Sequence, residues 1–161
     1  MNKLVINTSS SLYFTKIGLL PRLLKYFQLM TTEEVKSEVN EGQDITYKDA
    51  RIIKEYISEM KIRVEKVKGT NMIIREFGMR ATDASVIALA KEASAFLATE
   101  DQQMEKVCLI TQTKITNTAL LVYYLWKKKE FDNEHALLLL DLLIRSGYNK
   151  EICLDMKERI V

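Results

Sequence analysis

The chain has 161 residues, of which 47% are hydrophobic, a size and composition typical of one domain with one substantial core. With 24 basic and 22 acidic residues the formal net charge is +2, so the overall charge makes no general case for nucleic-acid binding, and any such site must be local. The two cysteines, Cys108 and Cys153, lie far apart without partners at metal-ligand spacing, which excludes a zinc ribbon and gives no sign of a disulfide framework.

The first part of the chain predicts two buried strands separated by short helices. Leu4 to Ile6 is an apolar run that ends in polar residues, a pattern typical of a central strand in a parallel sheet. The apolar positions of residues 12–24 have helical spacing, and Gly18 followed by Pro21 indicates a stop and a restart. Phe27 to Met30 predicts the second strand.

The middle of the chain continues this alternation of helices and strands. Residues 31–34, Thr-Thr-Glu-Glu, open a helix with hydroxyl caps and acids in its first turn. Residues 50–57 have helical spacing, and Ile62 to Val67 alternates as a half-buried strand does. Residues 68–77 give no clear pattern.

From Ala81 to Ala93 small apolar residues predict a helix that packs closely on a sheet. Phe96 to Ala98 predicts the next strand, and Asp101 begins a helix that runs through Val107. Cys108 to Ile110 is interpreted as one more short strand. The whole pattern predicts an α/β fold with a central, mainly parallel sheet flanked by helices.

The last third of the chain is predicted to be helical. Residues 119–126 form an apolar and aromatic helix, residues 134–144 are rich in Leu, and residues 150–160 form an amphipathic helix. We interpret the aromatic residues of the first of these helices as core or interface rather than base-stacking residues. The Leu-rich helix is apolar on more than one side, so we expect it to pack on the domain and on a second subunit, as a homodimer.

These elements predict a single domain over residues 1–161, with an α/β core at 1–112 and C-terminal helices at 113–161. The longest apolar stretch, Ala136 to Ile144, is interrupted by Asp141 and is far shorter than the ~20 residues that a membrane-spanning helix needs. The apolar burst at the N-terminus is too short for a secretory signal. We therefore expect a cytoplasmic protein without membrane contact.

Polar residues follow the predicted strands where a ligand site is expected. In open α/β sheets, ligands bind beyond the carboxyl ends of central strands. Asn7 ends the first strand and Asp101 follows a later one, while Glu38 and Asp83 lie on helices after other segments. Clustered carboxylates repel one another unless a cation neutralises them, and oxygen ligands without His or Cys favour Mg²⁺ or Mn²⁺ over zinc. Taken singly, these acids are also ordinary surface acids or helix caps, so the hypothesis depends on their joint placement.

Four blocks of the sequence, in order, resemble the PIN-domain nucleases. The blocks are Val5-Ile6-Asn7-Thr8-Ser9, residues 31–39 ending Ser37-Glu38-Val39, residues 81–90 beginning Ala81-Thr82-Asp83, and Leu97-Ala98-Thr99-Glu100-Asp101. The match spans most of the chain, and the length and helical tail are similar to those of stand-alone prokaryotic members, which include the VapC-type toxin ribonucleases. No single block is specific; the order of all four carries the resemblance.

The resemblance implies a Rossmann-like α/β/α sandwich with a C-terminal helical extension, and hydrolysis of RNA phosphodiester bonds with Mg²⁺ or Mn²⁺. Glu38, Asp83 and Asp101 match the family's catalytic acids, and with Asn7 they would hold the metal. Thr8, Ser9 and Thr99 match positions where the family places hydroxyls near substrate and carboxylates, although turn and cap roles explain them equally well.

The sequence departs from the family at Asn7, where the family has an Asp. A carboxamide offers a neutral oxygen in place of a charged ligand, so metal affinity is expected to fall. Glu100 either supplies the missing charge or faces solvent. Three hypotheses follow: an endoribonuclease, including the toxin of a pair with an antitoxin protein; a catalytically weak or silent RNA-binding regulatory protein; and a ribosomal-RNA processing nuclease that lacks the usual zinc ribbon.

Overall fold

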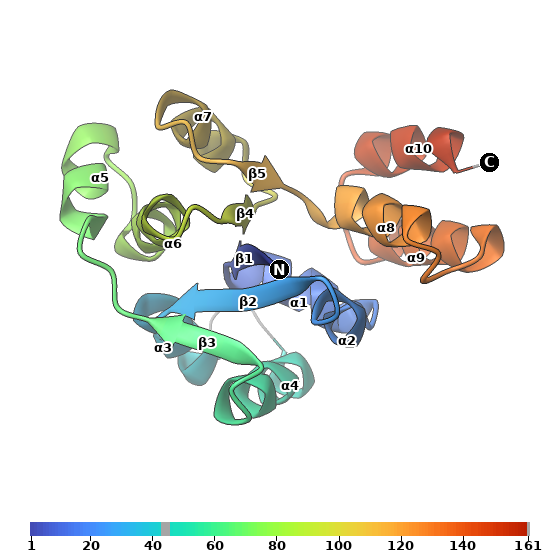
Figure 1. The fold of residues 1–161 in the computed structure, drawn as a ribbon, viewed down its shortest axis with the longest axis horizontal. Coiled ribbons are helices and arrows are strands. Elements are labelled where there is room, and N and C mark those ends of the chain that lie inside the picture. Colours follow the sequence, from blue (N-terminus) through green and yellow to red (C-terminus); the bar gives the residue numbers. More distant parts are fainter. Residues whose placement is uncertain (43–45, 161) are drawn as a thin grey trace.

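The computed structural model describes residues 1–42 and 46–160 and contains a five-stranded, fully parallel sheet (Figure 1). The strand order is β3-β2-β1-β4-β5, so the first strand lies in the middle. The strands are β1 (Asn2–Ile6), β2 (Phe27–Thr32), β3 (Ile62–Glu65), β4 (Phe96–Ala98) and β5 (Ile115–Thr116). The predicted α/β fold with a parallel sheet is confirmed.

Ten helices are found among the described residues, and with the sheet they form an α/β/α arrangement. They are α1 (Thr8–Lys16), α2 (Leu20–Leu23), α3 (Glu33–Glu41), α4 (Tyr47–Ser58), α5 (Thr70–Phe77), α6 (Ala81–Glu92), α7 (Gln102–Ile110), α8 (Thr118–Lys127), α9 (Asn133–Arg145) and α10 (Lys150–Arg159). Helix α6 packs on β1, β2 and β4, whereas α3 contacts β2 and α4 contacts β3.

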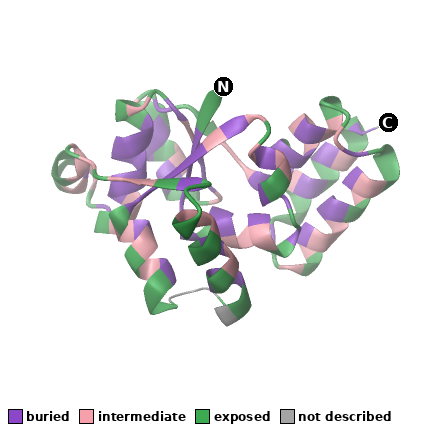
Figure 2. Ribbon diagram, turned by 60° about the horizontal axis from the view of Figure 1, so that its bottom comes forward, coloured by how far each residue is buried: buried purple, intermediate pink, exposed green. Residues whose placement is uncertain are grey.

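The core is centred on β1, whose last three residues, Leu4 to Ile6, are at most 1% exposed (Figure 2). A strand that is buried on both faces needs an apolar residue at every position, which explains the continuous run in the sequence. The small residues of α6 are buried from Ala84 to Ala90 and allow the helix to lie close to the sheet. This close packing fixes the beginning of α6 near the carboxyl end of the sheet.

The predicted strand at Cys108 to Ile110 is wrong, because these residues form the end of α7. Only Cys108 of the three is buried, while Leu109 and Ile110 are 81% and 67% exposed. A short apolar run cannot by itself distinguish a strand from a helix end. The fifth strand lies instead at Ile115–Thr116, so the sheet extends beyond the expected core boundary at residue 112.

Residues 68–77, which gave no clear pattern, contain the short helix α5. Only Ile73 in this helix is buried, so α5 contributes little to the core. Gly78 ends the helix with φ of +65°, a left-handed conformation that favours glycine. The loop that follows leads directly into α6.

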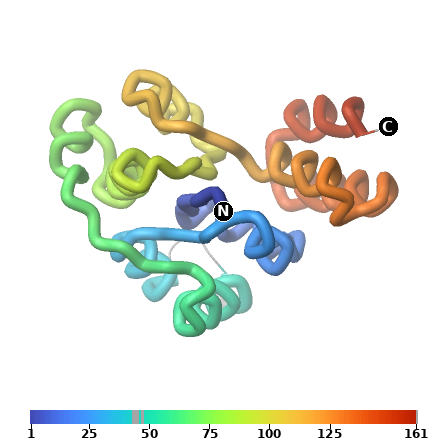
Figure 3. Tube along the Cα trace, in the orientation of Figure 1, coloured from blue at the N-terminus to red at the C-terminus, as the bar shows by residue number. Residues whose placement is uncertain are grey.

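Helices α8, α9 and α10 pack together beside the sheet and carry the C-terminus at the end of the molecule (Figure 3). Helix α9 buries Ala136, Leu139, Leu140 and Leu143 against its neighbours, whereas Leu138 remains 51% exposed. The homodimer stays a prediction. None of the helices in residues 1–42 and 46–160 has the length and apolar character needed to cross a membrane.

Candidate functional site

A small pocket of about 90 Å³ lies at the carboxyl ends of β1 and β2. It gathers side chains from three helices that are far apart in the sequence. Its lining residues are Asn7, Thr8, Ser9, Glu38, Arg80, Thr82 and Asp83. The pocket therefore brings together Asn7, two of the three predicted acids and both predicted hydroxyls of the first block.

Hydrogen bonds join the strands and helices that surround this pocket. The Thr31 hydroxyl donates to the Ile6 carbonyl at 2.8 Å, which ties the end of β2 to the end of β1. Thr32 is the N-cap of α3 and lies 2.8 Å from the Ser85 hydroxyl of α6. All four residues are at most 1% exposed. The helices that carry Glu38 and Asp83 are therefore fixed to the same strand ends.

Glu38 and Asp83 have different polar partners in the pocket. The Thr8 hydroxyl donates to Glu38 Oε2 at 2.6 Å, a short charge-assisted hydrogen bond that orients the carboxylate. Asp83 Oδ2 accepts from Arg80 Nε at 3.3 Å. With Arg80 counted, the ionised side chains of the pocket carry a formal charge of −1.

Asn7 caps helix α1 with the oxygen that a metal would need. Its Oδ1 accepts from the Ser10 backbone N–H at 2.9 Å and from the Ser9 hydroxyl at 3.2 Å. The Ser10 hydroxyl in turn lies 3.0 Å from the Asn7 backbone nitrogen, which completes a capping box. Asn7 Nδ2 faces Met104 Sδ at 3.8 Å. The carboxamide is thus suited to its helix-capping position whether or not an ion binds.

Asp101 lies outside this pocket, on an exposed position at the start of α7. Its Oδ1 accepts from the Met104 backbone N–H at 2.9 Å, the arrangement of a helix N-cap. Within residues 1–42 and 46–160, no three acidic, His or Cys side chains are grouped closely enough to hold a metal ion. The predicted joint cluster of Glu38, Asp83 and Asp101 is therefore not assembled in this structure.

Two substitutions at Asp101 separate its capping role from a role in chemistry. Asp101→Ser retains an oxygen that can cap α7, so its stability is expected to match that of the wild type, whereas Asp101→Ala is expected to lose about 1 kcal/mol. Both variants should lose metal-dependent RNA cleavage if Asp101 is a catalytic acid. Urea unfolding and a cleavage assay measure the two effects. Full cleavage by Asp101→Ser would leave Asp101 with a capping role only.

The remaining predicted residues, Thr99 and Glu100, face inward rather than toward the pocket. Thr99 is fully buried, and its hydroxyl accepts from the Asp101 backbone N–H at 3.1 Å and lies 3.7 Å from Met104 Sδ. Glu100 does not line this pocket; it is half-buried and lines a different one together with Tyr13 and Tyr148. It accepts from the Thr118 backbone N–H at 3.0 Å, from the Thr118 hydroxyl and from the Tyr148 hydroxyl.

The pKa of Glu100 is raised from 4.5 to about 7, chiefly by burial and also by the neighbouring Glu105 carboxylate, although the hydrogen bonds from Thr118 and Tyr148 lower it. Glu100 therefore links the end of β4 to α8 and to the turn before α10. It does not supply the missing charge beside Asn7.

The donor set of the pocket fits a partly hydrated divalent cation. Glu38, Asp83 and the hydroxyls are hard oxygen donors, and Mg²⁺ in proteins is commonly held by one or two carboxylates together with waters and substrate phosphates. The charge is low for such a site, because Asn7 is neutral and Arg80 is paired with Asp83. The pocket is therefore suited to weak rather than tight binding of a divalent ion.

Arg80 and Met104 are site residues that sequence reasoning missed. Arg80 precedes Asp83 by three residues, a helix-start spacing that favours an ion pair and was visible in the sequence. Met104 gave no such signal, since a Met in an apolar helix position is ordinarily a core residue. Its sulfur lies 3.8 Å from Asn7 Nδ2 and 3.7 Å from the Thr99 hydroxyl.

Comparison with solved structures identifies proteins of similar fold. The chain is similar to a domain of a functionally unknown protein from Methanocaldococcus jannaschii, with 24% identity, a TM-score of 0.52, and coverage of 73% of this chain and 91% of that one. PAE2754 from Pyrobaculum aerophilum is 14% identical with a TM-score of 0.48, over 74% of this chain and 93% of that one. No curated protein matches.

A family model described as DUF3368, PIN domain, matches residues 3–152, nearly the whole chain. The match includes all four blocks that carry the sequence resemblance and every residue that lines the pocket. The chain therefore belongs to the PIN-domain family, a nuclease-type family whose domains generally use divalent metal ions.

Proposed function

We propose that this protein is an endoribonuclease that hydrolyses RNA phosphodiester bonds with Mg²⁺ or Mn²⁺. The observation that supports this most directly is the convergence of Glu38 and Asp83, from α3 and α6, on one pocket beside Thr8 at the carboxyl end of β1. In a member of a nuclease-type family, this is the position where an α/β sheet binds its ligand.

Some pocket residues would orient the carboxylates, and others would contact the phosphate. When bound, a divalent ion would supply Lewis-acid stabilisation of the phosphate and a more acidic water. Thr8 holds Glu38 in one orientation, and Arg80 does the same for Asp83. The exposed Ser9 hydroxyl and the Arg80 guanidinium are the groups suited to contact phosphate oxygens.

Metal omission is the direct test. The purified chain is expected to cleave mixed RNA in Mg²⁺ or Mn²⁺, to lose this activity in excess chelator and to regain it when Mn²⁺ is restored. Asp83→Asn removes one of two carboxylates and should reduce cleavage at least tenfold. Asp155→Asn on α10 removes an acid that pairs with Arg159 at the surface and serves as the matched control. Equal cleavage by both variants would contradict the proposed site.

The main competing function is an RNA-binding or regulatory protein with little or no activity. It is favoured by Asn7, whose carboxamide oxygen already accepts two hydrogen bonds, and by the separation of Asp101 from the pocket. Retained RNA binding without metal-dependent cleavage would support this alternative. A toxin role is a narrower form of the first proposal, and it predicts growth arrest on expression that a small cognate antitoxin protein relieves.

A further inference from the structure

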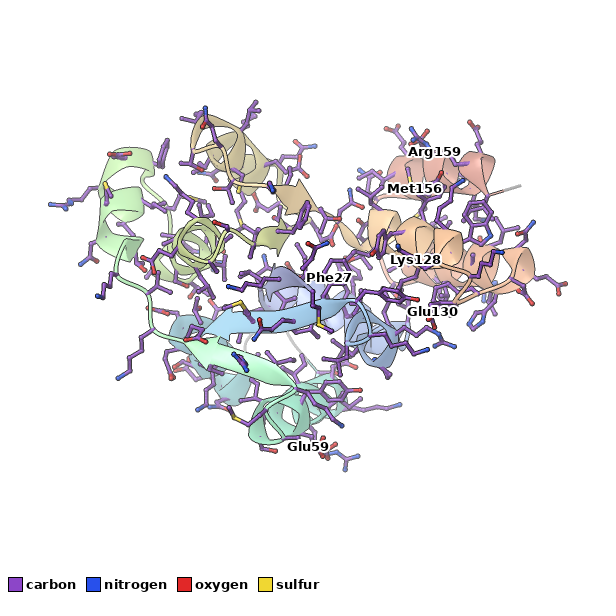
Figure 4. The ribbon with its side chains drawn as sticks, in the orientation of Figure 1. Phe27, Glu59, Lys128, Glu130, Met156 and Arg159 are labelled. Carbon is purple, nitrogen blue, oxygen red and sulfur yellow. The ribbon has the colours of Figure 1, made fainter. Side chains whose placement is uncertain are left out.

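A second and larger pocket, of about 340 Å³, lies at the opposite ends of the strands from the candidate site. Phe27 and Phe96 are the first residues of β2 and β4, and both line this pocket. Helix α8 contributes Tyr123, Tyr124 and Lys127 on the other side. Figure 4 shows Phe27 between the sheet and α8, on the side where Lys128 lies. The volume is within the range of roughly 300–1,000 Å³ that is usual for small-ligand pockets.

Several aromatic side chains line this pocket or lie beside it. Tyr124 lies 5.5 Å from Phe27 between ring centroids, and Tyr123 lies 5.5 Å from Trp126. Tyr123, Tyr124 and Trp126 are half-buried. The interpretation of these three residues as core or interface therefore holds only in part, because two of them line a pocket.

Lysines lie over the aromatic rings, and no acid is among the described residues that line the pocket. Lys127 Nζ lies 5.6 Å from the Tyr123 ring centroid and 5.1 Å from that of Trp126, while Lys114 Nζ lies 5.6 Å from Phe96. Residues 114–129 contain four lysines and no Asp or Glu. The next acid, Glu130, already pairs with Lys25 at 2.7 Å. The rim of the pocket is thus locally basic in a protein whose total charge is nearly neutral.

We propose that this pocket binds a nucleobase of single-stranded RNA between its aromatic rings, with the flanking phosphates on Lys114 and Lys127. Aromatic rings stack on any base, and lysines beside them bind the backbone, which is the combination that single-strand binding proteins use. The identification of the nucleic acid as RNA rests on the proposed function. The pocket would act as an anchoring subsite for the strand that reaches the cleavage site.

The distance between the two sites suits one continuous strand. They lie at opposite ends of β1, which has five residues and therefore spans roughly 16 Å. At about 3.4 Å per stacked nucleotide, roughly five nucleotides cover this straight-line length, and a strand that passes around the buried sheet needs more. An RNA of about ten nucleotides is therefore long enough to occupy both sites.

Charge favours RNA over a second copy of the chain as the occupant. In a two-fold interface centred on this pocket, the same surface of each subunit meets itself. Lys127, which lines the pocket, and Lys114, which lies over Phe96, would then come near their own symmetry mates. A polyanion instead gains from the same lysines through release of its counterions.

Trp126 provides an intrinsic probe, because it is the only tryptophan in the chain and lies beside Tyr123. The full-length protein is titrated, in chelator, with a non-cleavable 2′-O-methyl RNA of about ten nucleotides. Binding is expected to quench Trp126 fluorescence, and a duplex of the same sequence is expected to compete poorly. This readout does not depend on metal or on cleavage.

Variants at two positions separate stacking from charge. Tyr123→Phe keeps the ring and should bind as the wild type does, whereas Tyr123→Leu keeps only apolar volume and should bind about tenfold more weakly. Lys127→Gln should reduce the slope of log affinity against log salt concentration by about one. Lys54→Gln, at an exposed position of α4, should leave this slope unchanged. Circular dichroism and urea unfolding verify that each variant is folded.

Each outcome bears on the proposal. Unchanged RNA affinity in Tyr123→Leu overturns it, and conversion of a dimer to a monomer by the same variant would assign the pocket to a second copy. Quenching without any metal-dependent cleavage by the wild type would support this subsite and contradict the proposed nuclease activity. Cleavage that is equally efficient in wild type and Tyr123→Leu would support the nuclease and contradict the subsite.

Discussion

Replacing Asn7 with Asp is expected to raise metal-dependent RNA cleavage by roughly tenfold to a hundredfold. The side chain lines the candidate pocket beside Glu38 and Asp83, so the substitution adds one negative charge where a divalent ion would bind. A unit of opposite charge at short range contributes on the order of a few kcal/mol near a protein surface, which is enough for an effect of this size.

The same substitution is expected to destabilise the metal-free protein. One oxygen of the new Asp side chain keeps the hydrogen bond from Ser10, but the other replaces Nδ2 and faces the Met104 sulfur, which is not a hydrogen-bond donor. Asn7 is only 5% exposed, so this oxygen would be charged and largely removed from water. Loss of about 1–3 kcal/mol is expected without metal, and Mn²⁺ should restore it.

Thermal unfolding with and without Mn²⁺, beside the cleavage assay, measures both effects. Asn7→Ser is the matched control, because Ser also caps a helix N-terminus but adds no charge. It should show neither the gain in cleavage nor the metal-dependent stabilisation. If Asn7→Asp behaves as Asn7→Ser does, Asn7 is a helix cap without contact to the ion, and the metal site must be placed elsewhere.

Glu100→Gln is expected to make the protein more stable above neutral pH and to leave it unchanged in acid. The pKa of Glu100 is raised from 4.5 to about 7, so the folded protein binds a proton that the unfolded chain has already released in this window. Stability from this group is therefore fully present below about pH 4.5 and is lost as the pH rises through 7. The full difference corresponds to about 3 kcal/mol.

The Gln side chain imitates the protonated carboxyl group and removes this pH dependence. Its oxygen can accept from Thr118, and its amide can donate to Tyr148. Urea unfolding across this pH range compares the free energies of unfolding of the wild type and the variant. Glu158→Gln, at an exposed position of α10, is the control for the loss of a charge alone. A wild-type stability that rises between pH 4.5 and 7 relative to Glu100→Gln would contradict the assigned cause.

Most of the fold was predictable because the central strands are buried on both faces. Leu4 to Ile6 and Phe96 to Ala98 must be apolar at nearly every position, and such runs are visible without a structure. The strand at Ile115–Thr116 could not be predicted in the same way. It has only two residues, lies at the sheet edge, and Ile115 is 39% exposed, so nothing required a continuous apolar run.

The candidate site was predictable only at the level of its elements. The strand ends predicted that Asn7, Glu38 and Asp83 would lie near one another, and the pocket contains all three. The placement of Asp101 depends on a helix-capping hydrogen bond and on the packing of Met104 beside Asn7. Such contacts depend on which side chains meet across the core, and sequence spacing does not encode this.

The central position of β1 also constrains the order in which the molecule can be built during synthesis. Leu4 and Val5 leave the ribosome well before their partners in β4, Phe96 and Leu97. Until those residues have been translated, one edge of β1 remains unpaired, and its apolar side chains lack the contacts that β4 provides. Pairing over such a separation is also slow. The nascent chain is therefore expected to depend longest on chaperone protection while residues between β2 and β4 are being made.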